Sequence, residues 1–377
     1  MRPDEPDPHA PAHTRHTVDA SGGRAPRPDE FRDRVPRSDA NSDRVPRPDS
    51  SRDRVPRSDA NSDRVPRSDS NSDRVPRPGA PTPSRRLAGA PISWGVCEVP
   101  GWGRQLPPER VLGEMAGLGL TATELGPLGY LPLDADALRA RLDAHGLALV
   151  GGFVPLVLHE RTSTEALAAA TRIAGHLNVA GAEVFVAAAV MDAGWSAPKP
   201  LDRTQLSHLA ANLAEVAALV ADHGLTFALH PHAGTLVESA EDVERLLALT
   251  EVGWCLDTGH LLIGGCDPVG FVRDHGDRVT HVHLKDVDAV VASRYRTGEL
   301  TLMGATQAGM FRPLGQGDAS IAEVLAELDA QGYERWLVLE QDAAITGEEP
   351  PVGSGPVLDV QASVEFLAST APRRERV

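Results

Sequence analysis

Side chains that can bind a metal ion or carry a proton follow four consecutive apolar runs in the second half of the chain. They are His230 and His232 in FALHPH, Asp257 and His260 in WCLDTGH, His281, His283 and Lys285 in THVHLKD, and Glu340 in RWLVLEQD. Buried ionisable groups are costly unless they are paired or bound to a metal. Imidazole and carboxylate ligands without thiolate suit Mn2+, Co2+, Fe2+ or Zn2+. The pattern therefore predicts a divalent metal site in preference to a set of structural histidines.

These side chains meet only if the runs that carry them are parallel strands ending at one rim. Residues 87–377 alternate short β-rich runs with amphipathic stretches, which is typical of a parallel α/β fold. The predicted strands are Pro91–Cys97, Ala122–Leu125, Leu147–Val154, Glu183–Ala188, Thr226–His230, Gly253–Asp257, Val279–Leu284 and Trp336–Glu340. The predicted helices include Pro108–Ala116, Glu165–Leu177, Arg203–Ala221, Ala240–Leu249, Ile321–Ala330 and Val360–Leu367.

Eight such units predict a (β/α)8 TIM barrel, in which the carboxyl ends of the strands carry the chemistry. A doubly wound open sheet is the rival fold. It is disfavoured because no GxGxxG motif opens the first unit and no phosphate-binding loop is present.

Residues 1–86 differ sharply from the rest of the chain. They hold 15 of the 31 prolines, and the pentapeptide DRVPR recurs every ten residues from Asp33 to Asp73. With so few apolar side chains this segment cannot offset its ordering entropy, so we expect a disordered tail followed by one barrel domain over residues 87–377. The tail is either an arginine-rich interaction arm or, as we favour, an expanded repeat or an over-extended start of the reading frame.

Composition narrows the choice of partners. The net charge of -16 divides into 18 Arg against 15 acids in the tail, hence +3, and 19 basic against 38 acidic residues in the body, hence -19. An acidic body argues against nucleic acid or an anionic membrane surface as a partner.

Apolar runs such as Leu147–Leu158 are too short to span a bilayer, and the amino terminus lacks a secretory signal. Three cysteines without a CxxC pair suit a reducing cytoplasm, where we expect the protein as a monomer or a homo-oligomer.

Five segments together resemble a known family. They are ISWGVCEVPGWG (92–103), TATELGPLGYLP (121–132), HPHAGTLVES (230–239), CLDTGHLLIGGCDP (255–268) and HVHLKDV (281–287). This pattern resembles the xylose isomerase-like barrel superfamily of sugar phosphate isomerases and epimerases, over residues 88–370. It is most similar to the inosose dehydratase branch, whose members dehydrate 2-keto-myo-inositol.

The resemblance implies one divalent metal ion, commonly Mn2+ or Co2+, with Zn2+, Fe2+ or Mg2+ as alternatives. By position, Asp257, His283 and Glu340 match three metal ligands of the superfamily. The fourth is a glutamate in the epimerases, and here His230 takes its place, with His232 as the alternative ligand. Replacing that glutamate disfavours two-base epimerisation and favours the dehydratase branch.

The expected reaction is enolisation next to a ketone followed by loss of water. Glu340 is the first candidate for the base and His260 or His232 for the acid, while Lys285 either holds a substrate oxygen or forms a salt bridge. A sugar or keto-polyol ring is expected to contact Glu124, His232 and Trp94, with Trp94 and Trp102 together forming an apolar wall.

Two cysteines and one long connection complete the expectations. Cys97 and Cys255 are expected inside strands as small core residues, and Asp286–Asp318 as a flexible segment that covers the mouth of the barrel. The alternative functions are a metal-dependent isomerase or epimerase on the same site, a metal-dependent nuclease, and a non-catalytic sugar-binding barrel. The acidic body speaks against the nuclease.

Overall fold

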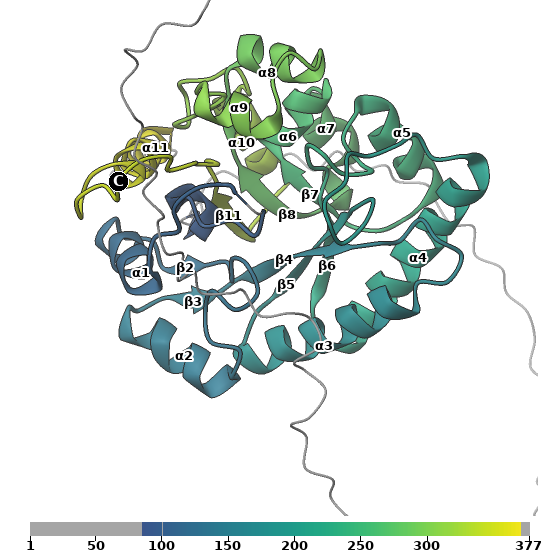
Figure 1. Ribbon diagram of the computed structural model, residues 1–377, viewed down its shortest axis with the longest axis horizontal. Coiled ribbons are helices and arrows are strands. Elements are labelled where there is room, and N and C mark those ends of the chain that lie inside the picture. The colour runs from purple at the N-terminus through teal and green to yellow at the C-terminus, as the bar shows by residue number, and fades with distance from the viewer. Residues whose placement is uncertain (1–84, 100, 371–377) are drawn as a thin grey trace, which may run out of the picture. The chain divides into compact units, whose positions relative to one another are not determined.

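The computed structural model of the chain describes residues 85–99 and 101–370. In this part of the chain, parallel strands form the centre and helices surround them (Figure 1). The strands, in the order in which they pair, are β3 (Ala148–Leu149), β2 (Ala122–Thr123), β1 (Arg86–Gly89), β11 (Trp336–Leu339), β8 (Val279–Leu284), β7 (Trp254–Asp257), β6 (Thr226–Leu229), β5 (Val184–Ala189) and β4 (Gly151–Leu156).

The strands β3 and β4 are two halves of one barrel strand. The break falls at Val150, whose N–H donates to Thr123 while its carbonyl accepts from Glu183 and Val184. One half therefore pairs with β2 and the other with β5, which brings the two edges of the sheet together. Eight strand positions result, and the predicted (β/α)8 barrel is confirmed.

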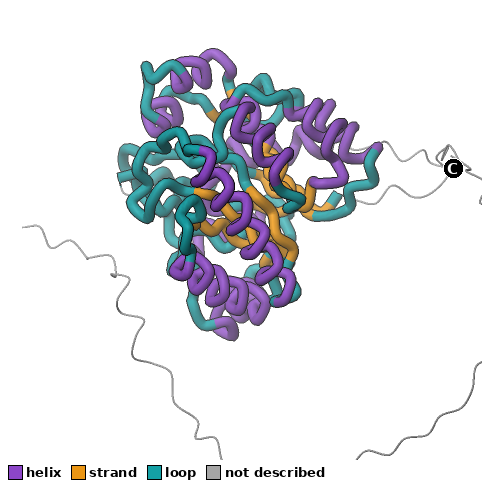
Figure 2. The backbone as a smooth tube through the Cα atoms, turned by 90° about the vertical axis from the view of Figure 1, so that its right-hand side faces the viewer, coloured by secondary structure: helices purple, strands orange, loops and turns teal. Residues whose placement is uncertain are grey.

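Helices cover the outside of the strands, as the purple and orange tubes of Figure 2 show. They are α1 (Pro108–Gly117), α2 (Ala135–Ala144), α3 (Thr164–Ala180), α4 (Arg203–Asp222), α5 (Ala240–Leu249), α6 (Thr258–Gly264), α7 (Pro268–His275), α8 (Ala289–Arg296), α9 (Leu302–Gln307), α10 (Ile321–Ala330) and α11 (Pro356–Thr370). The apolar residues of α10 recur at helical spacing, and all four of them are buried against the barrel. Among the described residues, no helix combines the length and apolarity that a membrane span requires.

The first predicted strand is wrong. Strand β1 lies earlier, at Arg86–Gly89, where it pairs with β11 and β2. Pro91–Trp94 forms a 3-10 turn instead, which ends at Gly95 with φ +80°. Pro91 stands at the start of this turn, where its fixed φ suits the first helical residue and its missing N–H is not needed. Arg86, placed at the end of the predicted tail, belongs to the barrel; residues 1–84 of that tail lie outside the described residues.

The connection from β8 to β11 is folded rather than irregular. Its strands β9 (Asp286–Val287) and β10 (Phe311–Arg312) pair antiparallel, and α8 and α9 lie between them. Apolar side chains of this segment form their own cluster, in which Val287, Met310 and Phe311 are buried. The buried carboxylate of Asp286 accepts N–H bonds of 2.8–3.0 Å from Val287, Gly315, Gly317 and Ala319.

Replacing Asp286 should destabilise the protein because four backbone donors lose one charged acceptor. We expect Asp286→Ala to lower the free energy of unfolding by about 3 kcal/mol, measured by urea denaturation. Asp136→Ala, at a carboxylate that is 86% exposed, is the matched control and should change it by less than about 0.5 kcal/mol. Equal stability of the two variants would show that Asp286 does not hold this segment.

Candidate active site

The carboxyl ends of four adjacent strands bring ionisable side chains together inside the barrel. His230 follows β6, Asp257 ends β7, His283 lies near the end of β8, and Glu340 follows β11. All four are buried, and each was predicted from the sequence to lie at this rim. Asp257 also caps α6: its Oδ1 accepts the N–H of His260 at 2.8 Å, which turns Oδ2 towards the other three side chains.

The atoms of these side chains lie close together, with His283 Nδ1 within 3.6 Å of an atom of each of the other three. His230 Nε2 lies 3.2 Å from Asp257 Oδ2 and 3.2 Å from His283 Nδ1. His283 Nδ1 lies 3.6 Å from Asp257 Oδ2 and 3.3 Å from Glu340 Oε2. Atoms bound to one ion at about 2.1 Å are about 3.0–3.5 Å apart, so the donors present fit a divalent cation. His230, rather than His232, belongs to this set.

Glu124 is held behind the cluster by two imidazoles. Its Oε1 lies 2.8 Å from His281 Nε2 and 3.1 Å from His283 Nε2. Burial alone would raise the pKa of Glu124, but the charge of His283 and the bonds from both rings hold it far below its usual value. Burial alone would likewise lower the pKa of His283, yet the surrounding anions, Glu340 and Glu124 among them, raise it well above normal. Glu124 therefore fixes His283 as well as lining the cavity.

Lys285 is a fully buried cation among three carboxylates. Its Nζ lies 2.8 Å from Asp342 Oδ1, 3.1 Å from Glu340 Oε2 and 3.4 Å from Asp257 Oδ2. Burial alone would lower the pKa of Lys285, but these anions hold it well above its usual value. The salt-bridge interpretation of Lys285 is thus correct, and the ammonium also lines the cavity where a substrate oxygen could reach it.

Asp342 was not identified from the sequence. It follows Glu340 by two positions, so alternation at the strand end was the signal that could have revealed it. The side chain is buried and lines the cavity beside Lys285. Burial raises the pKa of Asp342 to about 6, although Lys285 opposes the shift.

The two remaining histidines differ in their access to the cavity. His232 lines it, and its Nδ1 lies 2.7 Å from the carbonyl oxygen of Ala233, to which it donates. Its Nε2 is therefore left as an acceptor. His260 lies behind, its ring centroid 3.9 Å from that of His232 and its Nε2 2.9 Å from Lys285 Nζ. Burial, together with the charges of His230 and Lys285, lowers the pKa of His232 to about 3.

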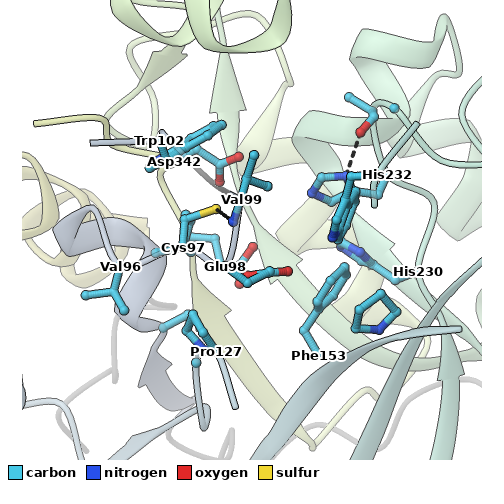
Figure 3. A pocket seen from close by; sticks show the side chains of 18 of the residues that line it. Val96, Cys97, Glu98, Val99, Trp102, Pro127, Phe153, His230, His232 and Asp342 are labelled. Carbon is cyan, nitrogen blue, oxygen red and sulfur yellow. Dashed lines mark hydrogen bonds between the residues drawn. The ribbon is translucent and has the colours of Figure 1, made fainter. Parts of the chain in front are cut away.

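A cavity of about 730 Å3 is lined by His230 and Glu340 of the cluster and by Glu124, His232, Lys285 and Asp342, whereas Asp257 and His283 do not line it. Figure 3 shows Val96, Cys97, Val99 and Trp102 along one wall, with His230, His232 and Phe153 facing them. Trp195 continues the second wall, and neither it nor Phe153 was identified from the sequence.

Two residues lie elsewhere than predicted. Trp94 does not line the cavity; it is fully buried, and its Nε1 donates to Glu114 Oε2 at 2.8 Å. Trp102, the other tryptophan considered, is in the cavity wall. Cys97 lies outside any strand and faces the cavity, because the first strand ends before it, whereas Cys255 is buried in β7 as expected.

Fold and site together define a (β/α)8 barrel with histidines and carboxylates gathered at the carboxyl ends of its strands. Residues 112–370 match the family model of the xylose isomerase-like TIM barrel, and the chain belongs to this family. The resemblance found in the sequence is thereby confirmed.

Individual relatives are similar over most of their length. An inosose dehydratase of Geobacillus kaustophilus (strain HTA426) is 34% identical over 278 residues, which cover 69% of this chain and 89% of the relative. The rhizopine catabolism protein MocC of Rhizobium meliloti is 32% identical over 300 residues, which cover 76% of this chain and 89% of the relative. Among solved structures, an L-ribulose 3-epimerase shares the fold, with a TM-score of 0.55 and 17% identity, over 76% of this chain and 94% of the other.

The converging donor atoms predict which histidine holds a metal. We expect the metal-stripped full-length chain to bind one Mn2+ per chain by isothermal titration calorimetry. His230→Ala should weaken that affinity at least about tenfold, because it removes a nitrogen from the donor set. His232→Ala is the matched control and should leave the affinity within about threefold. The reverse order would assign the ligand role to His232.

Proposed function

We propose that this protein is a metal-dependent dehydratase, a carbon–oxygen lyase that acts on a keto-cyclitol such as 2-keto-myo-inositol. The single observation that carries the proposal is the close approach of His230, Asp257, His283 and Glu340 to one another beside Lys285, with His230, Glu340 and Lys285 lining a cavity. The name of the relative from Geobacillus, inosose dehydratase, supports this choice of reaction and substrate.

The donor set suits one divalent ion, for which Mn2+ or Co2+ is proposed. His230, Asp257, His283 and Glu340 would hold it. Such an ion, when bound, supplies Lewis-acid polarisation of the ketone oxygen of the substrate. In the rest of the reaction the side chains of the protein bind the ring and move protons.

We assign removal of the proton next to the ketone to His232 instead of Glu340. Glu340 Oε2 already lies 3.3 Å from His283 Nδ1 and 3.1 Å from Lys285 Nζ, so this carboxylate is occupied. His232 presents an unprotonated Nε2 because its Nδ1 donates to Ala233. An imidazole in this tautomer accepts a proton rather than donating one, and its lowered pKa keeps it unprotonated at neutral pH, so we assign His232 as the base, although the same lowering weakens its basicity.

Lys285 stabilises the negative charge that develops on the substrate oxygen. The proton that His232 removes is then passed to the departing hydroxyl group, which leaves as water and restores the neutral imidazole. Asp342 and His260 position the ammonium of Lys285 at 2.8 and 2.9 Å. His260, a candidate acid in the sequence, does not line the cavity and therefore acts through Lys285. Glu124 lines the cavity and can accept a hydroxyl of the ring.

The reaction is tested by proton NMR of the Mn2+-loaded protein with 2-keto-myo-inositol in deuterated buffer. We expect a dehydrated diketone product, because proton removal next to the ketone leads to loss of the hydroxyl group on the next carbon. Uptake of deuterium without loss of water would instead assign the protein to isomerases or epimerases on the same site. An unchanged substrate would exclude the inositol assignment.

The role of His232 is tested by His232→Gln, which keeps a polar side chain but removes the base. We expect kcat to fall by about 10²–10⁴-fold, with KM and Mn2+ affinity within about threefold. The comparison variant Glu340→Gln should chiefly weaken Mn2+ binding, because it alters the donor set. Retained kcat in His232→Gln, with loss of turnover in metal-saturated Glu340→Gln, would return the base to Glu340.

A further inference from the structure

The cavity is larger than a bare keto-cyclitol requires. Its volume is about 730 Å3, within the range of sites that enclose drug-sized ligands. One six-membered polyol ring, packed as in an organic crystal, fills roughly 200 Å3. Most of the space beyond the ionisable side chains is therefore free for another part of the substrate.

The walls of that space are largely apolar, although Glu98, Tyr295 and Thr301 also line the cavity. Apart from these, the lining away from the ionisable side chains comes from separate loops and strands and includes the apolar residues Val99, Trp102, Pro127, Phe153, Trp195 and Met303. Hydroxyl groups placed against these walls would lose their hydrogen bonds to water without replacement, which disfavours a second polyol ring there.

Trp195, which lies in one of these walls, has a strained backbone conformation. Its backbone has φ +57°, a left-handed conformation that bulky residues avoid. A turn holds it there: the N–H of Trp195 donates to the carbonyl of Asp192, and the Asp192 carboxylate accepts the N–H of Gly194 and Ser196. The indole stacks on Phe153 at a centroid distance of 6.2 Å and 15°, and meets His232 edge-on at 6.2 Å. Backbone strain of this kind persists where the placed side chain has a function.

We propose that the substrate is a keto-polyol ring that carries an apolar, aromatic substituent, which binds between Trp195, Phe153 and Trp102. This inference rests on the proposed function, because the ring itself must reach His232 and Lys285. The aromatic substituent lies on Phe153 and Trp195, whose stacked faces suit another aromatic ring. The bond changes at the ring remain those of the dehydratase reaction.

The test uses two sugars without a ketone, so that binding is measured without turnover. Phenyl β-D-glucopyranoside and methyl β-D-glucopyranoside are titrated into the Mn2+-loaded full-length protein by isothermal titration calorimetry. We expect the phenyl compound to bind at least about tenfold more tightly, as burial of an aromatic ring predicts. Equal affinities, or no detectable binding of the phenyl compound, would overturn the proposal.

Variants of Trp195 distinguish the contribution of its side chain to ligand binding from its contribution to stability. Trp195→Gly should retain the melting temperature, because glycine adopts positive φ without strain, and should reduce the phenyl preference to less than about threefold. Trp195→Phe keeps an aromatic face and should keep most of the preference. Leu249→Ala, at an exposed side chain of α5, is the control and should change neither. An undiminished preference in Trp195→Gly would overturn the assignment to this wall.

The two proposals fail separately. Neither glucoside can be dehydrated through a ketone, so the phenyl preference does not depend on the dehydratase reaction. If 2-keto-myo-inositol is dehydrated but the phenyl preference is absent, the substituent proposal is wrong and the dehydratase proposal stands. If the preference is present but 2-keto-myo-inositol is unchanged, the apolar site stands and the assignment of 2-keto-myo-inositol as the substrate is wrong.

Discussion

The compensation of buried negative charge is the constraint on which the rest of this structure depends. Four carboxylates, those of Glu124, Asp257, Glu340 and Asp342, are buried within one end of the barrel. Isolated carboxylates in such surroundings would be protonated or would unfold the protein. Lys285 supplies part of the compensating charge, and the donor atoms of His230, Asp257, His283 and Glu340 face one another in a way that suits a divalent cation. The same arrangement that solves the charge problem thus provides the chemistry.

The four residues from Asp257 to His260 all help to hold Lys285 in place beside the carboxylates. Asp257 caps α6 with one oxygen and faces the donor set with the other. Thr258 Oγ1 donates to the carbonyl of Lys285 and accepts its N–H, which locks β7 to the end of β8. Gly259 must be glycine because a Cβ there would lie 2.6 Å from Cγ of Lys285. His260 then contacts the ammonium at 2.9 Å. Four consecutive residues therefore set the position of one buried lysine.

The walls of the cavity follow a different principle from the ionisable cluster. The cluster is held by strands whose pairing fixes each side chain, as Asp257 pairs in register with His283. Apart from Phe153 and its neighbours in β4, the walls come mostly from connections between strands, including the folded segment after β8, which an apolar cluster and the Asp286 carboxylate keep ordered. Loops on a rigid scaffold can change specificity without disturbing the reacting groups. The breadth and apolarity of this cavity are consequently properties of the loops, and the chemistry is a property of the strands.

Much of this protein could be predicted from its sequence, because hydrophobic periodicity and strand-end polarity are local signals. They placed seven of the eight barrel strands and all four residues of the donor set, and the quoted motifs indicated the family. The first strand was misplaced because Pro91 and its neighbours are apolar, and an apolar run alone does not distinguish a strand from a buried turn.

Other features of the site are set by contacts between segments that are distant in the sequence. The close approach of His230 to Asp257 and His283, the position of His260 behind Lys285, the burial of Trp94 in the core and the stacking of Phe153 on Trp195 all depend on which strands and loops become neighbours. Neighbours in space are decided by closure of the barrel, so only the tertiary structure could show them.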